Sequence, residues 1–265
     1  MKTINKISLG IVIIALLLVG YAVFSGRLNK STILSAADNM PLLSDQAAND
    51  SADAVQAVVP SSSVSPSVIQ KATVIDQKVP FTAQAPTGDW QDERQQDGCE
   101  EASALMAVYW AEGKSLNSSI ALTQILGASD YELKAHGEFR DISVNDAVQW
   151  IYKEYFKYTK VVVKRNVTIA SLIAELEKGN VIVAPMQGQE LGNPYFTPPG
   201  PERHMLLIRG YDKNKKQFIT NDPGTKHGQG YRYNQDVLYN AILSYPTGKH
   251  LPVTTIVKDV IVVSK

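Results

Sequence analysis

The hydrophobic pattern begins with an uninterrupted apolar run at residues 7–24, which follows Lys2 and Lys6. An apolar run of about 18 residues without a charge is close to the length that spans a bilayer as a helix. The preceding lysines favour a cytoplasmic N-terminus and an extracytoplasmic remainder. We therefore expect a signal anchor over residues 1–26. Cleavage near residues 23–25 is the alternative, and it would give a secreted protein.

Residues 27–72 have the pattern of a linker. No Lys or Arg occurs between residues 31 and 70, aromatic residues are absent there, and serines cluster at 61–63 and 65–67. Such a stretch can bury little apolar surface, so the ordering of its backbone is not compensated. It predicts a disordered extracytoplasmic linker between the anchor and a folded domain.

Residues 73–265 carry the periodic patterns of a folded domain. Helical spacing of apolar positions predicts helices over residues 99–110, 118–126, 143–155 and 168–178. Further along, the pattern predicts strands over residues 159–165, 180–186, 204–211, 217–220 and 230–233, a short helix over 236–244, and one or two strands within 253–263. A turn at 212–215 makes two of the strands a hairpin. Helices followed by antiparallel strands are typical of an α+β domain.

Composition narrows the functional classes. The 265 residues include 26 Lys and Arg against 26 Asp and Glu, so the chain lacks the basic excess that holds nucleic acid phosphates. Hydrophobic residues make up 44% of the chain, which suits a folded globular domain after the linker. The single cysteine, Cys99, excludes an intrachain disulfide framework and any Cys-rich metal site.

Cys99 stands at the predicted start of the first helix of the domain. The free N–H groups and the dipole at a helix start favour an anion, so a thiol there is expected to lose its proton more easily. A thiolate is a nucleophile, and the following amides can face a developing oxyanion. The alternative is a buried bystander, because Cys99 shares an apolar stripe with Ala102.

A nucleophilic cysteine requires a base, and His204 is the best placed of the four histidines. It opens an apolar strand after the Pro-rich stretch 198–201, and a side chain at the rim of a sheet can face a cleft. His136 is expected in a polar loop between helices without an obvious partner. A satisfied rim histidine is the structural alternative for His204.

Asp222 is the candidate for the group that orients the imidazole. The hairpin returns it near the His204 end of the preceding strand, where its carboxylate can accept from one ring nitrogen. The alternative is an ordinary turn residue, since 221–224 reads as a turn sequence. A zinc site from Cys99, His204, Asp222 and His227 is also conceivable, but the spacing matches no tight ligand pattern.

Four ordered stretches resemble one known family, the C39-like group of papain-like cysteine peptidases. They are residues 79–84 (VPFTAQ), 97–103 (DGCEEAS), 204–212 (HMLLIRGYD) and 221–223 (NDP). The resemblance implies a papain-like fold, in which a helical half carries the cysteine, a β half carries the histidine, and a cleft lies between them.

The resemblance also implies a catalytic set: Cys99 as the nucleophile, His204 as general base and acid, Asp222 as the orienting residue, and Gln84 as the oxyanion-hole donor beside the Cys99 N–H. Gln95 and Gln96 lie nearer to the cysteine in sequence and are alternatives for the last role. The Gly- and Pro-rich stretch 187–203, which contains Tyr195 and Phe196, is expected to line the cleft.

The resulting hypothesis is a membrane-anchored, extracytoplasmic cysteine peptidase or amide hydrolase that acts on a peptide or protein substrate. Its expected partners are that substrate and, through the N-terminal helix, the membrane, but not nucleic acid. The mechanism needs no metal or organic cofactor. Two alternatives remain: a catalytically inactive peptide-binding module on a papain-like fold, and an acyltransferase or deamidase with the same triad.

Overall fold

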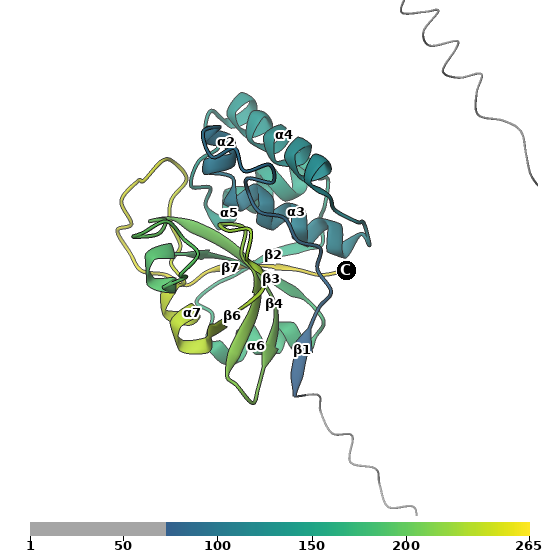
Figure 1. Cartoon of the computed structure of the whole chain (residues 1–265), viewed down its shortest axis with the longest axis vertical. Coiled ribbons are helices and arrows are strands. Elements are labelled where there is room, and N and C mark those ends of the chain that lie inside the picture. The colour runs from purple at the N-terminus through teal and green to yellow at the C-terminus, as the bar shows by residue number, and fades with distance from the viewer. Residues whose placement is uncertain (1–72) are drawn as a thin grey trace, which may run out of the picture. The chain divides into compact units, whose positions relative to one another are not determined.

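The computed structural model describes residues 73–265, in which helices and an antiparallel sheet form an α+β fold (Figure 1). The predicted membrane anchor (1–26) and linker (27–72) lie outside the described residues. Within 73–265, no helix is both long and apolar enough to cross a membrane. The α+β class predicted from the order of helices and strands is confirmed.

One seven-stranded antiparallel sheet organises the domain, in the order β2-β7-β3-β4-β5-β6 with β1 paired to β4. The central strand β4 pairs with β3 through His204–Ile208 and with β1 through Gly210–Asp212. The strands are β1 Val74–Asp76, β2 Val161–Lys164, β3 Val181–Met186, β4 His204–Asp212, β5 Gln217–Asn221, β6 Gln229–Asn234 and β7 Val260–Val263.

Helices cover both faces of the sheet (Figure 1). On one side lie α2 Glu93–Gln96, α3 Cys99–Ala111, α4 Ser118–His136, α5 Val144–Asp146 and the π-helix η1 Ala147–Tyr155. On the other side lie α6 Ile169–Glu177 and α7 Gln235–Ala241, and the short 3₁₀ helix η2 Gly188–Leu191 follows β3. Most of the predicted helices and strands are therefore found close to their predicted bounds.

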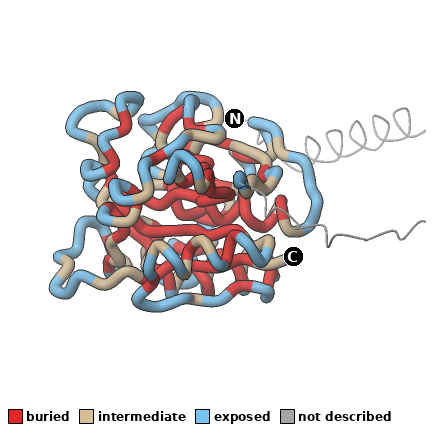
Figure 2. Tube along the Cα trace, turned by 90° about the horizontal axis from the view of Figure 1, so that it is seen from below, coloured by how far each residue is buried: buried red, intermediate tan, exposed pale blue. Residues whose placement is uncertain are grey.

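The core lies on both faces of the central strands. Successive residues of β3 and β4 point to opposite faces. One set packs with α3 and η1, namely Val181, Val183, Met205 and Leu207. The other set packs with α6 and α7, namely Ile182, Ala184, Leu206 and Ile208. Figure 2 shows this buried layer running through the middle of the domain. Burial on both faces explains why these strands are continuous apolar runs.

The prediction that the helix over 118–126 stops at Gly127 is wrong, because α4 continues to His136. The helix ends at Gly137, whose φ of 84° is the left-handed conformation that glycine adopts readily. Gly127 lies within the helix at a close contact, where an added Cβ would come within 2.4 Å of the Tyr155 hydroxyl oxygen. Its small size serves packing against η1, which a sequence pattern cannot distinguish from a helix stop.

Other elements refine the predictions or were not predicted. The helix over 143–155 begins as expected with Ser143 accepting from the Asp146 N–H, but it becomes a π-helix that closes with a bond from Phe156 N–H to Ile151 O. Only Val260–Val263 of the stretch 253–263 forms a strand. The strand β1 and the helix α2 were not predicted, since each is only three or four residues long.

Candidate active site

Cys99 is the first residue of α3, as its sequence position predicted. The preceding N-cap is Gly98, which has no side chain to bond the first turn, so no capping side chain competes for the Cys99 N–H at this end. The Cys99 side chain is 6% exposed and lines the cleft between the helical layer and the sheet. A helix start therefore presents the thiol to the cleft.

A buried hydrogen bond fixes the start of α3 against the start of β4. Ser103, one turn after the cysteine, donates from Oγ to the main-chain oxygen of Met205 at 3.1 Å. Ser103 and Met205 are both fully buried. Because Met205 directly follows His204, this bond, together with the apolar packing of α3 on β4, holds the helix end that carries Cys99 beside the strand end that carries His204.

His204 and Asp222 form a buried pair, as the hairpin predicted. The sheet register pairs Leu207 with Asn221, which brings the residue after β5 back toward the first residue of β4. His204 Nε2 lies 2.8 Å from Asp222 Oδ1, and the two side chains are 2% and 0% exposed. The bond occupies Nε2, so Nδ1 is the ring nitrogen left for another partner.

Further donors hold the Asp222 carboxylate in place. Tyr233 donates from its hydroxyl to Oδ2 at 2.6 Å, and the Gly224 N–H donates to Oδ1 at 3.0 Å. Asn193 donates to the Tyr233 hydroxyl at 2.7 Å and lies 3.4 Å from Oδ2. Burial raises the pKa of Asp222, but the His204 ring and these donors outweigh it, so the pKa lies below its usual value. The carboxylate therefore stays ionised beside the imidazole.

The thiol of Cys99 has a different neighbour from the one expected. Its hydrogen bond goes to Glu100 Oε2 at 3.0 Å, and Glu100 Oε1 accepts from the Tyr245 hydroxyl at 2.8 Å. Burial first, and then the Glu100 carboxyl, raise the pKa of the thiol well above its ordinary value. The expectation that the helix start eases loss of the thiol proton is wrong for this state. It took account of the helix but not of the buried acid beside the sulfur.

Gln84, the expected oxyanion-hole donor, is buried and lines the cleft. Its main-chain N–H donates to Pro223 O, which ties the segment to the turn after Asp222. Its side-chain nitrogen donates to the main-chain oxygens of Gln95 at 3.1 Å and Gln96 at 2.6 Å. Both amide protons are thus in use, and an oxyanion would have to displace one of these carbonyls. Gln95 is 2% exposed, whereas Gln96 lines the cleft.

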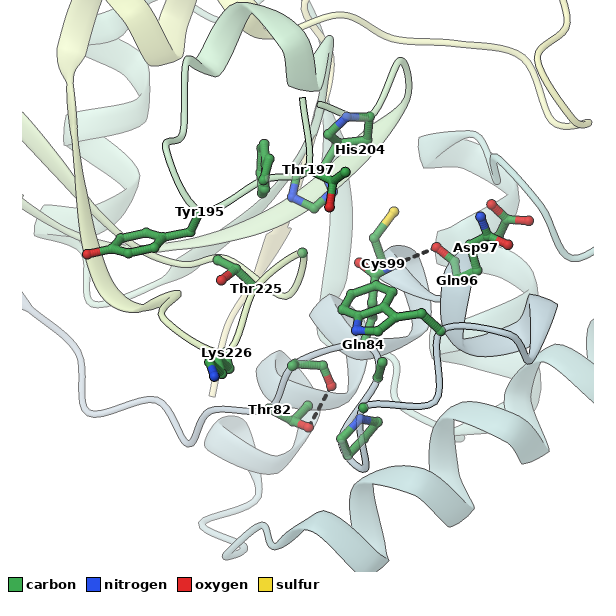
Figure 3. A pocket seen from close by; sticks show the side chains of 18 of the residues that line it. Thr82, Gln84, Gln96, Asp97, Cys99, Tyr195, Thr197, His204, Thr225 and Lys226 are labelled. Atoms are coloured by element: carbon green, nitrogen blue, oxygen red, sulfur yellow. Dashed lines mark hydrogen bonds between the residues drawn. The ribbon is translucent and has the colours of Figure 1, made fainter. Parts of the chain in front are cut away.

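The cleft has a volume of about 1230 Å³ and is bounded by both layers of the domain. In Figure 3, Cys99 and Gln84 come from the helical side, while His204, Tyr195 and Thr225 come from the opposite side of the same pocket. Of the stretch 187–203, residues 195–197 and 200–203 line the cleft, so its expected place is confirmed for that part, whereas residues 187–194 do not line it.

The other histidines have separate environments. His136 is the last residue of α4, where its ring stacks on Trp150 at 4.2 Å and its Nε2 lies 2.7 Å from Glu154, so the expectation of a loop position without a partner is wrong. His227 and His250 both line the cleft, and His227 packs against Tyr195 at 4.5 Å. Within 73–265, no group of three or more His, Cys, Asp or Glu residues is arranged to hold a metal ion.

Several residues of the site were not found from the sequence. They share burial and a polar contact to the Cys99, His204 or Asp222 neighbourhood, and they are Glu100, Ser103, Asn193, Tyr233 and Tyr245. Glu100 and Ser103 lie in the stretch around the cysteine, so a polar residue on the buried face of a predicted helix was an available signal. The others are brought in by the fold from distant parts of the chain.

A cysteine at a helix start and a histidine that lines the same cleft and is bonded to a buried aspartate are the arrangement used by thiol hydrolases. A sequence profile of the Peptidase C39-like family matches residues 76–248, and the chain belongs to that family. The resemblance carried by the four stretches between residues 79 and 223 is therefore confirmed.

Two solved structures are similar to this chain. One is a candidate C39-like peptidase from Bacillus anthracis, with 16% identity, coverage of 72% of this chain and 97% of that chain, and a TM-score of 0.48. The other is xylellain, a cysteine protease from Xylella fastidiosa, with 14% identity, coverage of 73% and 86%, and a TM-score of 0.42. A search of the curated proteins finds no significant match.

Proposed function

We propose that this chain is a membrane-anchored, extracytoplasmic cysteine peptidase or amide hydrolase. As in papain-like enzymes, the helical layer carries the nucleophile and the sheet carries the base. Cys99 is the nucleophile, His204 the general base and acid, and Asp222 the orienting residue. The observation that carries the proposal is the buried 2.8 Å bond from His204 Nε2 to Asp222, which leaves Nδ1 for the thiol that lines the same cleft. Membership of a family of C39-like peptidases supports it.

The proposed reaction follows from these positions. The thiol proton passes from Sγ to His204 Nδ1, and the thiolate attacks the carbonyl carbon of the substrate. The imidazolium then gives that proton to the leaving amine as the C–N bond breaks, which leaves an acyl-enzyme on Cys99. Water loses a proton to the same imidazole and releases the acid. Asp222 stays ionised throughout and stabilises the imidazolium.

The negative oxygen of the tetrahedral intermediate needs donors in this mechanism. The Cys99 N–H at the start of α3 is one, because helix starts keep unbonded N–H groups. Gln84 is proposed as the second, after its amide releases the carbonyl of Gln95, to which it has the longer of its two bonds. Loss of a single donor of this kind typically costs about 100- to 1,000-fold in rate.

The first test measures how fast iodoacetamide alkylates Cys99 between pH 4 and 9 in the full chain held in detergent micelles. We expect His204→Ala to slow labelling by about 100-fold or more, because that variant lacks the base that Asp222 orients. His136→Ala, which alters an exposed ion pair with Glu154, is the matched control and should label as wild type does. Equal labelling in the His204 variant would refute the Cys–His pair.

The reaction itself is tested with a peptide library and mass spectrometry of the products. Cleaved peptides that disappear with Cys99→Ser would establish the hydrolase. An added amine separates the alternatives, because a transferase would join it to the acyl group whereas a hydrolase would release the acid. Deamidation without chain cleavage would identify the third possibility.

The membrane part of the proposal rests on the apolar run at residues 7–24. We expect the full chain to stay with membranes after extraction at alkaline pH and to yield a protected N-terminus and a protease-accessible domain in intact cells. A variant in which two leucines of residues 16–18 are replaced by lysine should no longer be retained. Recovery of the unaltered full chain in the soluble fraction would overturn the anchor.

One observation favours a second candidate function, a peptide-binding module without turnover. The thiol is bonded to Glu100 instead of His204, and its pKa is raised by burial and by that carboxyl. A binding module would bind peptides with the same affinity in wild type and Cys99→Ser and would release them unchanged. Cysteine-dependent cleavage in the library experiment excludes this candidate.

A further inference from the structure

Glu100 is a buried carboxyl group next to the proposed nucleophile that the mechanism above does not use. Only 1% of it is exposed. Its Oε2 lies 3.0 Å from the Cys99 sulfur, and its Oε1 lies 2.8 Å from the Tyr245 hydroxyl. The same hydroxyl lies 3.2 Å from the main-chain oxygen of His204. The Tyr245 hydroxyl thus lies between the acid that bonds the thiol and the strand that carries the base, and it can donate to either.

The hydroxyl of Tyr245 has one proton and two acceptors within reach. When Glu100 is ionised, both of its oxygens accept, one from the thiol and one from Tyr245. When Glu100 carries a proton, it can become a donor toward the sulfur, and Tyr245 can donate to His204 O. The geometry therefore accommodates both protonation states of Glu100 without moving a main-chain atom.

We propose that Glu100 controls the nucleophile by reversing this hydrogen bond: as a neutral acid it donates to the Cys99 thiolate, and as a carboxylate it accepts a hydrogen bond from the thiol and keeps the sulfur protonated and unreactive. The inference rests on the proposed function and adds its regulation. In the active form, the thiol proton is on His204 Nδ1 and Glu100 keeps its own proton. Loss of one proton to solvent converts this form into thiol, neutral imidazole and carboxylate.

The surroundings of Glu100 favour the neutral acid near neutral pH. Burial and then the Glu101 carboxyl raise the pKa of Glu100 to about 8. The titratable groups that face it come from its own helix, from α4, from the loop before α5 and from the segment after α7, and they are Cys99, Glu101, Glu132, Asp141 and Tyr245. None of these five can carry a positive charge. The one positive charge in the proposed active form is on His204 of β4, whose main-chain oxygen lies 3.2 Å from the Tyr245 hydroxyl and which lines the same cleft as Cys99.

The sign of the pH effect separates this role from a structural one. An ordinary thiol gains thiolate as pH rises. Here the thiolate should decrease as Glu100 ionises, by about tenfold one pH unit above the Glu100 pKa, because about one-tenth of the acid then keeps its proton. Activity near pH 7 would be lost on the alkaline side as Glu100 ionises.

The experiment records the pH profile of Cys99 alkylation by iodoacetamide from pH 5 to 9.5 in the full chain. Wild type should show a plateau and then a fall of about tenfold around pH 8 to 9. Glu100→Gln cannot ionise and can still donate an N–H to the thiolate, so its profile should show no fall. Glu112→Gln, at the other end of α3 and paired with Lys114, is the matched control and should retain the wild-type profile.

Tyr245→Phe gives an independent test if Glu100→Gln does not fold. The tyrosine donates to the Glu100 carboxylate and so lowers the pKa of Glu100. Its removal should raise that pKa, and the alkaline fall should move upward by about half to one pH unit. A fall that stays in place or moves downward overturns the proposal, as does a Glu100→Gln profile that matches wild type.

The outcomes also separate this inference from the proposed function. If His204→Ala leaves alkylation unchanged, the Cys–His pair fails and the Glu100 proposal fails with it. If His204→Ala slows alkylation but wild type and Glu100→Gln have the same profile, the hydrolase stands and the role of Glu100 is rejected.

Discussion

His204 and Cys99 reach the cleft from opposite walls and are held in different ways. On the sheet side, the His204 ring is bonded to Asp222, and Asp222 accepts further bonds from Tyr233 and Gly224. On the helix side, the thiol has one bond, to the carboxyl group of its chain neighbour Glu100. The base is therefore held in one orientation, whereas the nucleophile has a choice of partners.

This contrast follows from the elements that carry the two groups. A sheet register brings strand ends together over a long stretch, and Leu207 opposite Asn221 determines where Asp222 returns. The start of a helix offers N–H groups but does not select among side chains that come near it. The nucleophile therefore depends on whichever residues the fold packs against the first turn, here Glu100 and Tyr245.

The largest expected effect comes from removing the carboxylate that bonds His204 on the sheet side of the cleft. Asp222→Asn replaces the acceptor at His204 Nε2 with a group that can donate, and this favours the imidazole tautomer whose Nδ1 carries the proton and cannot take another. We expect the rate of Cys99-dependent hydrolysis to fall by about 100- to 10,000-fold with little change in circular dichroism.

The matched control for this change is Asp212→Asn. Asp212 ends β4 and pairs with Arg232, so it shares the strand with His204 but does not bond to it. We expect wild-type rates there. Hydrolysis at a wild-type rate in Asp222→Asn would show that His204 needs no orienting carboxylate, and the contrast between the two walls would lose its functional meaning.

The second effect concerns the hydrogen bond between α3 and β4, which connects the two walls of the cleft. Ser103→Ala removes the donor to Met205 O in a fully buried position and leaves that carbonyl without its partner. We expect the free energy of unfolding of the full chain to fall by about 1–3 kcal/mol, measured by denaturant titration. Alkylation of Cys99 should also slow, since the helix start is no longer fixed against the strand start.

Ser119→Ala is the control for Ser103→Ala. Ser119 lies in the first turn of α4 and is exposed, so its removal should change the stability by no more than a few tenths of a kcal/mol. If both serine variants lose the same stability, the loss reflects helix propensity in general and not the bond between α3 and β4.

Local patterns explain why some of this site could be predicted. The apolar run that begins at His204, the turn at 212–215 and the return of Asp222 are neighbours in sequence, so hairpin geometry alone placed the pair. The helix start at Cys99 was predictable for the same reason. The partner of the Glu100 carboxyl was not, because Tyr245 lies 145 residues from Glu100 and meets it only in the folded domain.

The same reasoning applies to the fold. Gly127 has the sequence features of a helix stop, and only the position of Tyr155 shows that its small size serves packing inside α4. The strand β1 is three residues long, too short for an alternating pattern, and it exists because the end of β4 offers it a pairing edge. Packing between residues far apart in the sequence determines both features, and the local sequence pattern does not contain that information.

The smallest effect sharpens the comparison on the sheet side. Tyr233→Phe removes the 2.6 Å donor to Asp222 Oδ2 and leaves the His204 bond in place. Because the tyrosine hydroxyl favours the ionised carboxylate, its loss should raise the pKa of Asp222 from a value now below the usual one. Asp222 would then take up a proton at a higher pH during acidification. We expect the acid limb of the hydrolysis profile to move upward by about half to one pH unit, with little change at pH 7.

Tyr231→Phe, whose ring packs 4.7 Å from that of Tyr233, should leave the acid limb in place. An acid limb that shifts equally in both variants would mean that ring packing, and not the hydroxyl, keeps the orienting carboxylate ionised.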